Sequence, residues 1–344
     1  MEAFKITDSP NKKDWSDFVY NHPHGNIFQT PEMAEVYKRT KNYEPITLAA
    51  LDDNNRIIAL LQAVMIKEGG ILGPFSARSI IYGGPLFIES ENGISALKVL
   101  MQHYDKIVQK KALYTEIRNL WDTLQILNIF NDIGYTYSDH LNFLVDLTKS
   151  REELWSNLSR KRRNNIRRGI KRGVKVREVK DRELIDSFYN LIKETYKNAK
   201  LPLADISLFV SIFELLVPKD MAKFFLAMHE DESIGAILVL TYKGVIYDFY
   251  AGSSREHLYL CPNDVLVWHV IEYGSMNGYH TFDFGGAGSP KKRYGVRDFK
   301  RQFGGAMVNF GRYRKIHAPL RFWLAERGFK LYRRIKWRKQ KPYS

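Results

Sequence analysis

The sequence contains one cysteine, Cys261, among its 344 residues. A single thiol excludes an internal disulfide framework and suits a reducing compartment such as the cytoplasm. One cysteine with nine scattered histidines does not supply a tetrahedral metal site, so we expect no bound metal. No Ser-His-Asp or Cys-His arrangement is recognisable either, and the sequence therefore offers no evident machinery for a covalent enzyme intermediate.

Long apolar runs are also missing. No stretch approaches the roughly 18 apolar residues that a membrane-spanning helix needs, and the opening residues MEAFKITDSPNKKDW lack the apolar segment of a signal peptide. Hydrophobic residues nevertheless make up 44% of the chain, with 20 tyrosines and 20 phenylalanines, which is typical of a globular protein. The length favours two domains.

Acidic residues are scarce in two segments that account for the net charge of +15. Residues 160–177 hold ten basic side chains and no acid, and residues 312–341 hold twelve with one acid, Glu326. This clustering favours an anionic partner: nucleic acid, anionic lipid or a phosphorylated substrate. Residues 319–339 mix aromatic and leucine side chains with basic ones, which is typical of a helix on an anionic membrane surface. The alternative is a packed final helix with a basic tail.

Hydrophobic spacing and turn residues predict strands and helices that occur in a similar order in both halves of the chain. In the first half we expect helices at residues 31–40 and 93–111, with strands at 46–51, 56–66, 114–117 and 142–146. In the second half we expect one helix from a capping box at Ser150 to about Arg172, further helices at 183–198, 208–216 and 262–274, and strands at 174–179, 222–230, 233–242, 245–250 and 281–284. The repeated order predicts a duplicated α/β fold, with domains at 1–150 and 151–315 and a basic amphipathic helix and tail at 316–344.

Glycine and basic residues are concentrated in residues 278–305, GYHTFDFGGAGSPKKRYGVRDFKRQFGG. Glycine allows a backbone to approach a ligand closely and to adopt positive φ. Lysine and arginine beside such a loop can hold phosphate oxygens. This segment therefore predicts a site for a phosphate-bearing substrate, with a plain β-hairpin and solvated charges as the alternative.

Four motifs in this order resemble the Fem-type family of GNAT-like acyltransferases. They are FQTPEMAE at residues 28–35, LSRKRRNNIRRGIKRGVKV at 158–176, YDFYAGSS at 247–254, and FDFGG at 282–286 with FKRQFGG at 299–305. The family includes the aminoacyltransferases that form peptidoglycan interpeptide bridges and other cell-envelope enzymes. The resemblance implies an α/β (α+β) fold of two tandem GNAT-like domains, each a mixed twisted sheet flanked by helices, with the active site in the second.

The implied activity is transfer of an acyl or aminoacyl group to an amine of a phosphorylated cell-envelope precursor or glycan. The amine attacks directly, and the carbonyl lies beside the strand at 245–250, where backbone N–H groups stabilise the developing charge. No tightly bound cofactor is expected, and the acyl donor is either aminoacyl-tRNA or acyl-CoA. The sequence lacks the long coiled-coil arm of some bridge-forming relatives, and residues 252–260 lack the usual CoA pyrophosphate pattern. The implied partners are a phosphorylated small-molecule or lipid-linked acceptor, tRNA, and an anionic membrane surface at the inner face of the cell membrane.

The resemblance also assigns roles to residues near the implied site. Lys300, in the pattern Phe-Lys-x-x-Phe-Gly-Gly, becomes the expected contact for a substrate phosphate. Asp283 and Asp248 are the candidate proton acceptors or ammonium-orienting groups, and Tyr250 is a candidate donor to the leaving group. The residues expected to assist in substrate binding are Arg297, Arg293, Lys292, Gly285 and Gly286. The alternatives are a strand lysine facing water, carboxylates that cap turns, and a core tyrosine.

Two other functions remain open at this stage. One is a CoA-dependent N-acyltransferase that acts on a sugar nucleotide or polysaccharide unit. The other is a non-catalytic nucleic-acid-binding protein, which the charge alone would allow. Against the second, the sequence contains no compact RNA-recognition motif, and few aromatic residues interleave the basic segment at 160–177.

Overall fold

The computed structural model describes residues 4–69 and 73–338, and the chain folds into two compact units. The first unit consists of Met1–Lys38, Asn42–Ser138 and Arg312–Ser344, and the second of Arg39–Lys41 and Asp139–Gly311. The chain therefore leaves the first unit, builds the second, and returns to the first. We expected divisions at residues 150 and 315, whereas the contacts place them near 138 and 311.

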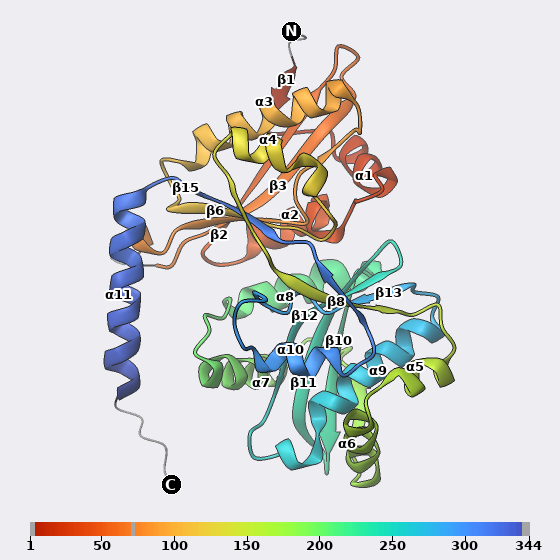
Figure 1. Cartoon of the computed structure of the whole chain (residues 1–344). Coiled ribbons are helices and arrows are strands. Elements are labelled where there is room, and N and C mark those ends of the chain that lie inside the picture. Colours follow the sequence, from red (N-terminus) through yellow and green to blue (C-terminus); the bar gives the residue numbers. More distant parts are fainter. Residues whose placement is uncertain (1–3, 70–72, 339–344) are drawn as a thin grey trace. The chain divides into compact units, whose positions relative to one another are not determined.

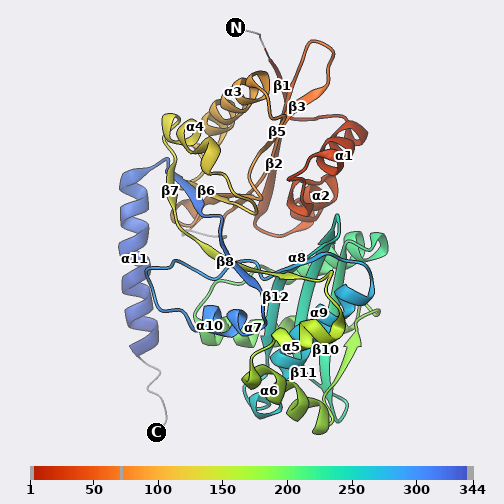
Figure 2. The same ribbon diagram turned by 45° about the vertical axis from the view of Figure 1, so that its right-hand side comes forward.

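The first unit is a mixed sheet with helices on both faces. Its strand order is β1-β2-β3-β4-β6-β15-β7, with β5 paired to β3, and only β4 and β6 run parallel. The strands are β1 (Lys5–Thr7), β2 (Tyr43–Leu51), β3 (Ile57–Ile66), β4 (Arg78–Tyr82), β5 (Leu86–Phe87), β6 (Tyr114–Arg118), β7 (Thr136–Ser138) and β15 (Arg312–Ile316). The helices are α1 (Lys12–Asn21), α2 (Pro31–Arg39), α3 (Glu91–Val108), α4 (Leu127–Asp132) and α11 (Pro319–Arg338). Figure 2 shows α3 and α4 together on one side of this sheet and α1 and α2 on the other.

The second unit has a sheet of order β14-β8-β13-β12-β11-β10-β9, in which only β12 and β13 are parallel. The strands are β8 (Leu141–Asp146), β9 (Lys175–Glu178), β10 (Ala222–His229), β11 (Glu232–Tyr242), β12 (Val245–Ser253), β13 (Thr281–Asp283) and β14 (Ala306–Asn309). The helices are α5 (Arg151–Asn157), α6 (Arg160–Lys171), α7 (Leu184–Ala199), α8 (Ile206–Leu216), α9 (Pro262–Met276) and α10 (Gly295–Arg301). Helix α9 is buried around most of its circumference and shares one continuous apolar core with residues of β8, β10, β11 and β13.

The two sheets share one plan, as the repeated order of elements predicts. Read from one edge, β7-β15-β6-β4-β3-β2-β1 corresponds to β14-β8-β13-β12-β11-β10-β9, with the parallel pair at the same place. In each sheet, the strand next to the parallel pair lies close to the point where the chain passes from one unit to the other. This strand is β15 beside β6 in the first sheet and β8 beside β13 in the second (Figure 1). The prediction of two tandem mixed sheets flanked by helices is confirmed.

One predicted helix is wrong in its extent. The capping box at Ser150 is present, with Ser150 and Glu153 bonded to each other's backbone N–H groups, but the helix ends at Asn157. Leu158 adopts an extended conformation (ψ 142°) and is buried, and Ser159 then caps a new helix by accepting from the Arg162 N–H. Core burial of Leu158 therefore divides the segment into α5 and α6, which hydrophobic spacing alone does not reveal.

The C-terminal helix α11 begins at Pro319, shortly after β15 (Figure 1), within the segment 316–344 for which the sequence predicts a helix and tail. Phe322 packs edge-on against Tyr114 of the first unit, with ring centroids 5.5 Å apart. Leu320, Trp323 and Leu324 are exposed, and Arg327 stacks over Trp323. The side chains that complete the predicted apolar stripe lie beyond residue 328, outside the described ones. Among the described helices, none is long and apolar enough to cross a membrane.

Candidate functional site

The parallel pair of the second sheet opens after three residues. Val245, Ile246 and Tyr247 pair with Thr281, Phe282 and Asp283, after which β12 continues to Ser253 beside β11 alone. At the opening, β12 carries a bulge, because Tyr250 and Asp248 oppose the consecutive residues Leu238 and Val239. A bulge bends its strand and redirects its side chains. The opening therefore frees the β13-facing edge of β12 from Asp248 onwards, where the sequence predicts the reacting carbonyl.

Asp283 closes the end of β13 and fixes the loop that follows. Its carboxylate accepts from Asn142 Nδ2 at 2.6 Å and from the Gly285 N–H at 2.6 Å. Asn142 in turn accepts from the Gly286 N–H at 2.8 Å. Burial raises the pKa of Asp283 above its usual range, although these hydrogen bonds oppose the rise. Asp283 thus positions the glycine loop, which was the alternative interpretation of this residue.

Asp248 differs from Asp283 in its partners. Within the described part of the chain its carboxylate accepts no hydrogen bond that would offset burial. Burial and the charge of Asp283 raise the pKa of Asp248 to about 6, and Lys300 opposes that rise. A carboxyl group with this pKa exchanges protons close to neutral pH, and its position at the opening of β12 makes Asp248 the candidate general base.

The glycine loop approaches β12 closely. Gly285 has φ +74° and Gly286 φ +122°. A Cβ atom added at Gly285 would lie 2.7 Å from the Asp248 carbonyl oxygen, so only glycine fits there without movement. The predicted strand–loop arrangement is present.

Lys300 points into this loop from α10, a helix that the sequence analysis did not predict. Its ammonium group donates to the Phe284 carbonyl in a very short hydrogen bond and to the Gly286 carbonyl at 2.9 Å. Burial lowers the pKa of Lys300, while Asp248 and Asp283 oppose the fall. The alternative interpretation of Lys300 as a strand lysine that faces water is therefore wrong. Two of its three N–H donors hold the loop, so one remains for a ligand.

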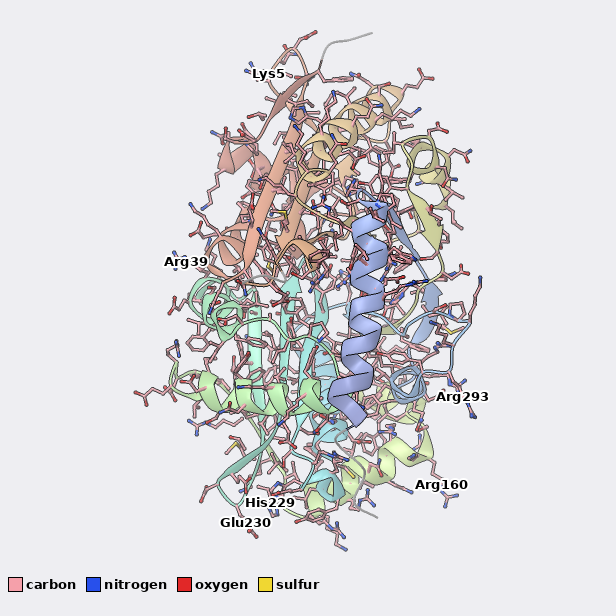
Figure 3. All side chains as sticks on the ribbon, turned by 90° about the vertical axis from the view of Figure 1, so that its left-hand side faces the viewer. Lys5, Arg39, Arg160, His229, Glu230 and Arg293 are labelled. Atoms are coloured by element: carbon pink, nitrogen blue, oxygen red, sulfur yellow. The ribbon has the colours of Figure 1, made fainter. Side chains whose placement is uncertain are left out.

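The other basic residues of the segment divide into two kinds. Arg297 donates to the carbonyl oxygens of Ala287 at 3.0 Å and Lys292 at 2.7 Å, and also to that of Ser289, so it holds the turn together. The side chains of Lys292 and Arg293 are exposed, and Figure 3 shows Arg293 at the periphery of the second unit. A substrate-binding role for these three residues stays a prediction.

Tyr250 lies in an aromatic cluster. Its ring centroid is 4.9 Å from that of Phe209, 4.8 Å from Phe249 and 5.5 Å from Tyr196. These contacts place the ring against α7 and α8, and a role as donor to a leaving group stays a prediction. Asn142 is the residue that the sequence analysis missed. A polar side chain inside the apolar strand segment Leu141–Asp146 was the available signal.

The basic helix α6 is only partly a solvated face. Arg162 is buried and pairs with Asp264 at 2.6 Å while stacking over Phe299. Arg168 donates to the buried Cys261 thiol at 2.7 Å. Arg160, labelled in Figure 3, and Arg167 remain exposed. In the described residues no group of three or more His, Cys, Asp or Glu side chains could hold a metal ion.

Comparison with known proteins places this geometry in context. The family described as "Acetyltransferase (GNAT) domain" matches residues 160–301. A Lipid II:glycine glycyltransferase of Staphylococcus haemolyticus is 22% identical, over 88% of this chain and 90% of that protein.

Solved structures share the fold. The crystal structure of FemX has a TM-score of 0.70 at 18% identity, and covers 93% of this chain and 99% of its own. A tandem GNAT protein from the clavulanic acid biosynthesis pathway has a TM-score of 0.60 at 10% identity, covering 92% and 99%. These comparisons confirm the resemblance of the chain to Fem-type GNAT-like acyltransferases that the motifs indicate.

Proposed function

We propose that the protein transfers an acyl or aminoacyl group to an amine of a phosphorylated, lipid-linked cell-envelope precursor. The observation that carries this proposal is the opening between β12 and β13, where Asp248 has a pKa of about 6 beside the loop that Asp283 and Lys300 hold. The similarity to proteins named Lipid II:glycine glycyltransferase supports a lipid-linked acceptor.

The proposed reaction is a direct displacement. The acceptor amine attacks the acyl carbon and forms the C–N bond, while the C–O bond to tRNA or the C–S bond to CoA breaks. Asp248 takes the proton that the amine loses, and the leaving oxygen or sulfur gains a proton from the medium or a nearby donor. Backbone N–H groups of β12 beyond Tyr247 face the developing oxyanion.

A transfer assay tests this proposal. The full chain would be incubated with Lipid II and either labelled glycyl-tRNA or labelled acetyl-CoA, and label on the lipid would be measured. We expect transfer by the wild type and loss of at least a hundredfold in Asp248→Asn, consistent with removal of a general base. Transfer from acetyl-CoA to a sugar nucleotide, and none to Lipid II, would instead support the CoA-dependent alternative.

If aminoacyl-tRNA is the donor, the exposed face of α6 is the proposed contact for its phosphates. Arg167, Lys171 and Arg172 are exposed there, whereas Arg162 is engaged in the protein interior. Binding through such residues should weaken steeply with salt. Arg167→Gln with Lys171→Gln should weaken tRNA binding several-fold, and equal binding would exclude α6.

We also propose that α11 holds the enzyme at an anionic membrane surface. Leu320, Trp323 and Leu324 are exposed on a helix whose sequence carries seven basic residues and one acid. Flotation with vesicles of phosphatidylglycerol should fall for the triple serine variant of these residues. Truncation after Arg314 is a poorer test, because Lys315 and Ile316 belong to β15. The matched control is Met276→Ser, which changes an exposed apolar residue of the second unit. Equal flotation of the wild type, the triple serine variant and Met276→Ser would contradict the proposal.

A further inference from the structure

Four charged residues share one face of the first sheet, on two neighbouring strands. Arg312 lies opposite Arg118 and Arg314 opposite Glu116 in the antiparallel pair of β15 and β6, which Figure 1 shows side by side. Because alternate residues of a strand point to the same side, all four side chains lie on one face. We call Arg118, Arg312, Arg314 and Glu116 the arginine cradle.

One carboxylate serves three guanidinium groups in this cradle. Glu116 accepts from Arg118 Nε at 2.8 Å, from Arg312 Nη1 at 3.1 Å and from Arg314 Nη2 at 2.6 Å. Although burial opposes it, the arginines hold the pKa of Glu116 at about 2. Glu116 is therefore ionised at any physiological pH, and the cradle keeps an excess of two positive charges.

The surroundings act differently on two of these arginines. Burial, together with repulsion from Arg118 and Arg314, lowers the pKa of Arg312 to about 10, even though Glu116 opposes the fall. In contrast, although burial opposes the rise, Tyr82 and Glu116 raise the pKa of Arg118. Three guanidinium groups share one carboxylate, so the cluster carries more cations than its own anion neutralises.

The cations are accessible and the carboxylate is not. The side chain of Glu116 is 6% exposed, whereas those of Arg118, Arg312 and Arg314 are 32%, 24% and 48% exposed. An arriving anion would therefore meet guanidinium N–H groups before it met the repelling carboxylate.

Two tyrosines support the guanidinium groups. Arg118 lies 5.0 Å from the ring centroid of Tyr82 and donates to its hydroxyl at 2.9 Å, and Arg314 lies 5.2 Å from the ring centroid of Tyr114. Stacked guanidinium groups lose little freedom on binding, and their planar forks match the oxygens of phosphate. The cradle is therefore prepared for a tetrahedral oxyanion.

We propose that the arginine cradle of the first unit binds a phosphate or diphosphate group. The group belongs either to a soluble phosphate ester or to a phospholipid headgroup, since both present the same oxygens. This site goes beyond the proposed acyl transfer, which uses residues of the second unit and assigns no role to β6 or β15.

Calorimetric titration of the full chain with inorganic pyrophosphate at low ionic strength tests the inference. Arg314→Gln removes the most exposed guanidinium and should weaken binding about tenfold, a change equivalent to roughly 1.4 kcal/mol. Glu116→Gln removes the repelling charge and should tighten binding several-fold. A purely structural cluster would not respond in opposite directions to these two changes.

The matched control is Arg177→Gln, an exposed arginine paired with Asp181 in the second unit, which should leave binding unchanged. Arg312→Lys keeps the charge but loses the fork, and it should weaken binding if the protein melts at the wild-type temperature. No pyrophosphate binding by the wild type, or equal binding by wild type and Arg314→Gln, would overturn the proposal.

Vesicle binding distinguishes the two sources of the phosphate. If Arg314→Gln also reduces recruitment to phosphatidylglycerol vesicles, the group is a headgroup. If only pyrophosphate binding falls, the group belongs to a soluble ester. Both titrations proceed without acyl transfer, so an inactive preparation in the transfer assay would leave this result intact.

Discussion

The two units place one parallel strand pair at the same position of the same strand order, yet the residues at the end of that pair carry opposite charge. In the first unit the pair ends at Tyr82 and Arg118, within the arginine cradle. In the second it ends at Tyr247 and Asp283, beside Asp248. A tyrosine occupies the β4 and β12 position in both. The shared backbone thus carries three arginines around a glutamate in one unit and two aspartates in the other. The two proposed functions therefore differ through a few side chains on a common frame.

The largest expected effect comes from removing the carboxylate of Asp248, the proposed general base of the second unit. Asp248→Asn should reduce transfer by a hundredfold or more. The melting temperature should not fall, because the substitution replaces a partly buried carboxylate, to which no described residue donates a hydrogen bond, by a neutral group. Initial rates and thermal melts would be measured together. Asp298→Asn, on the exposed side of α10, is the control. Full activity of Asp248→Asn would remove the proposed base.

The second prediction contrasts Asp248 and Glu116 through pH. The folded pKa of Asp248 is raised to about 6, so its contribution to stability is present below its ordinary value and is lost as pH rises through 6. The folded pKa of Glu116 is lowered to about 2, so its contribution is present above its ordinary value near 4.5 and is lost as pH falls towards 2.

Melting temperatures between pH 3 and 8 test this contrast. Relative to wild type, Asp248→Asn should gain stability as pH rises from 4 to 7. Glu116→Gln should be less stable at neutral pH, by about 3 kcal/mol, as for a broken buried pair, and this deficit should shrink below pH 4. The transfer rate should also fall about tenfold per pH unit well below 6. Parallel pH profiles for the two variants would contradict the assignment of opposite shifts.

Lys300→Ala should show whether the lysine acts on substrate, on the loop, or on both. The Phe284 and Gly286 carbonyls lose their donor, which should destabilise the unit by about 1–3 kcal/mol. If the remaining N–H contacts a substrate phosphate, the KM for the acceptor should also rise. Arg301→Ala is the matched control, since its side chain is exposed at the end of the same helix. An unchanged acceptor KM would restrict Lys300 to a structural role.

The smallest expected effect separates backbone strain from steric contact. Gly285 and Gly278 both have positive φ, +74° and +76°, but an added Cβ meets the Asp248 carbonyl at 2.7 Å only at Gly285. Each alanine variant should lose about 1 kcal/mol from strain, and Gly285→Ala should lose further stability and activity as the loop moves. Thermal melts and transfer rates of the two variants would be measured. Equal losses in Gly285→Ala and Gly278→Ala would show that the close approach of Gly285 to the Asp248 carbonyl is unimportant.

Local structure was largely predictable. The strands at 222–230, 233–242 and 245–250 and the helices at 183–198 and 262–274 are confirmed within a few residues, because apolar spacing, turn residues and caps act over short distances. The short helix α10 was missed, since its seven residues GVRDFKR contain little apolar periodicity. The break at Leu158 was missed because core burial, not local preference, produces it.

Some of the residues named for the candidate site do lie together, but their contacts were not predictable. Asp248, Asp283, Lys300 and the glycine loop do lie around the opening of β12 and β13. Asp283 holds the loop, and Lys300 donates to carbonyls, through contacts within the same short segment, which residue patterns alone do not specify. Asn142 joins them through contacts more than 140 positions apart.

The sequence by itself determined the helices, the strands, the glycine turns and the concentration of positive charge, because each depends on neighbours along the chain. Only the tertiary structure decided that β8 completes the second sheet and β15 the first, and hence which charges meet. In the sequence, Arg312 and Arg314 belong to the basic segment at 312–341, yet strand pairing sets them around Glu116, almost 200 residues away. Pairing across such separations depends on the burial of whole sheets, so it is not encoded in any local pattern.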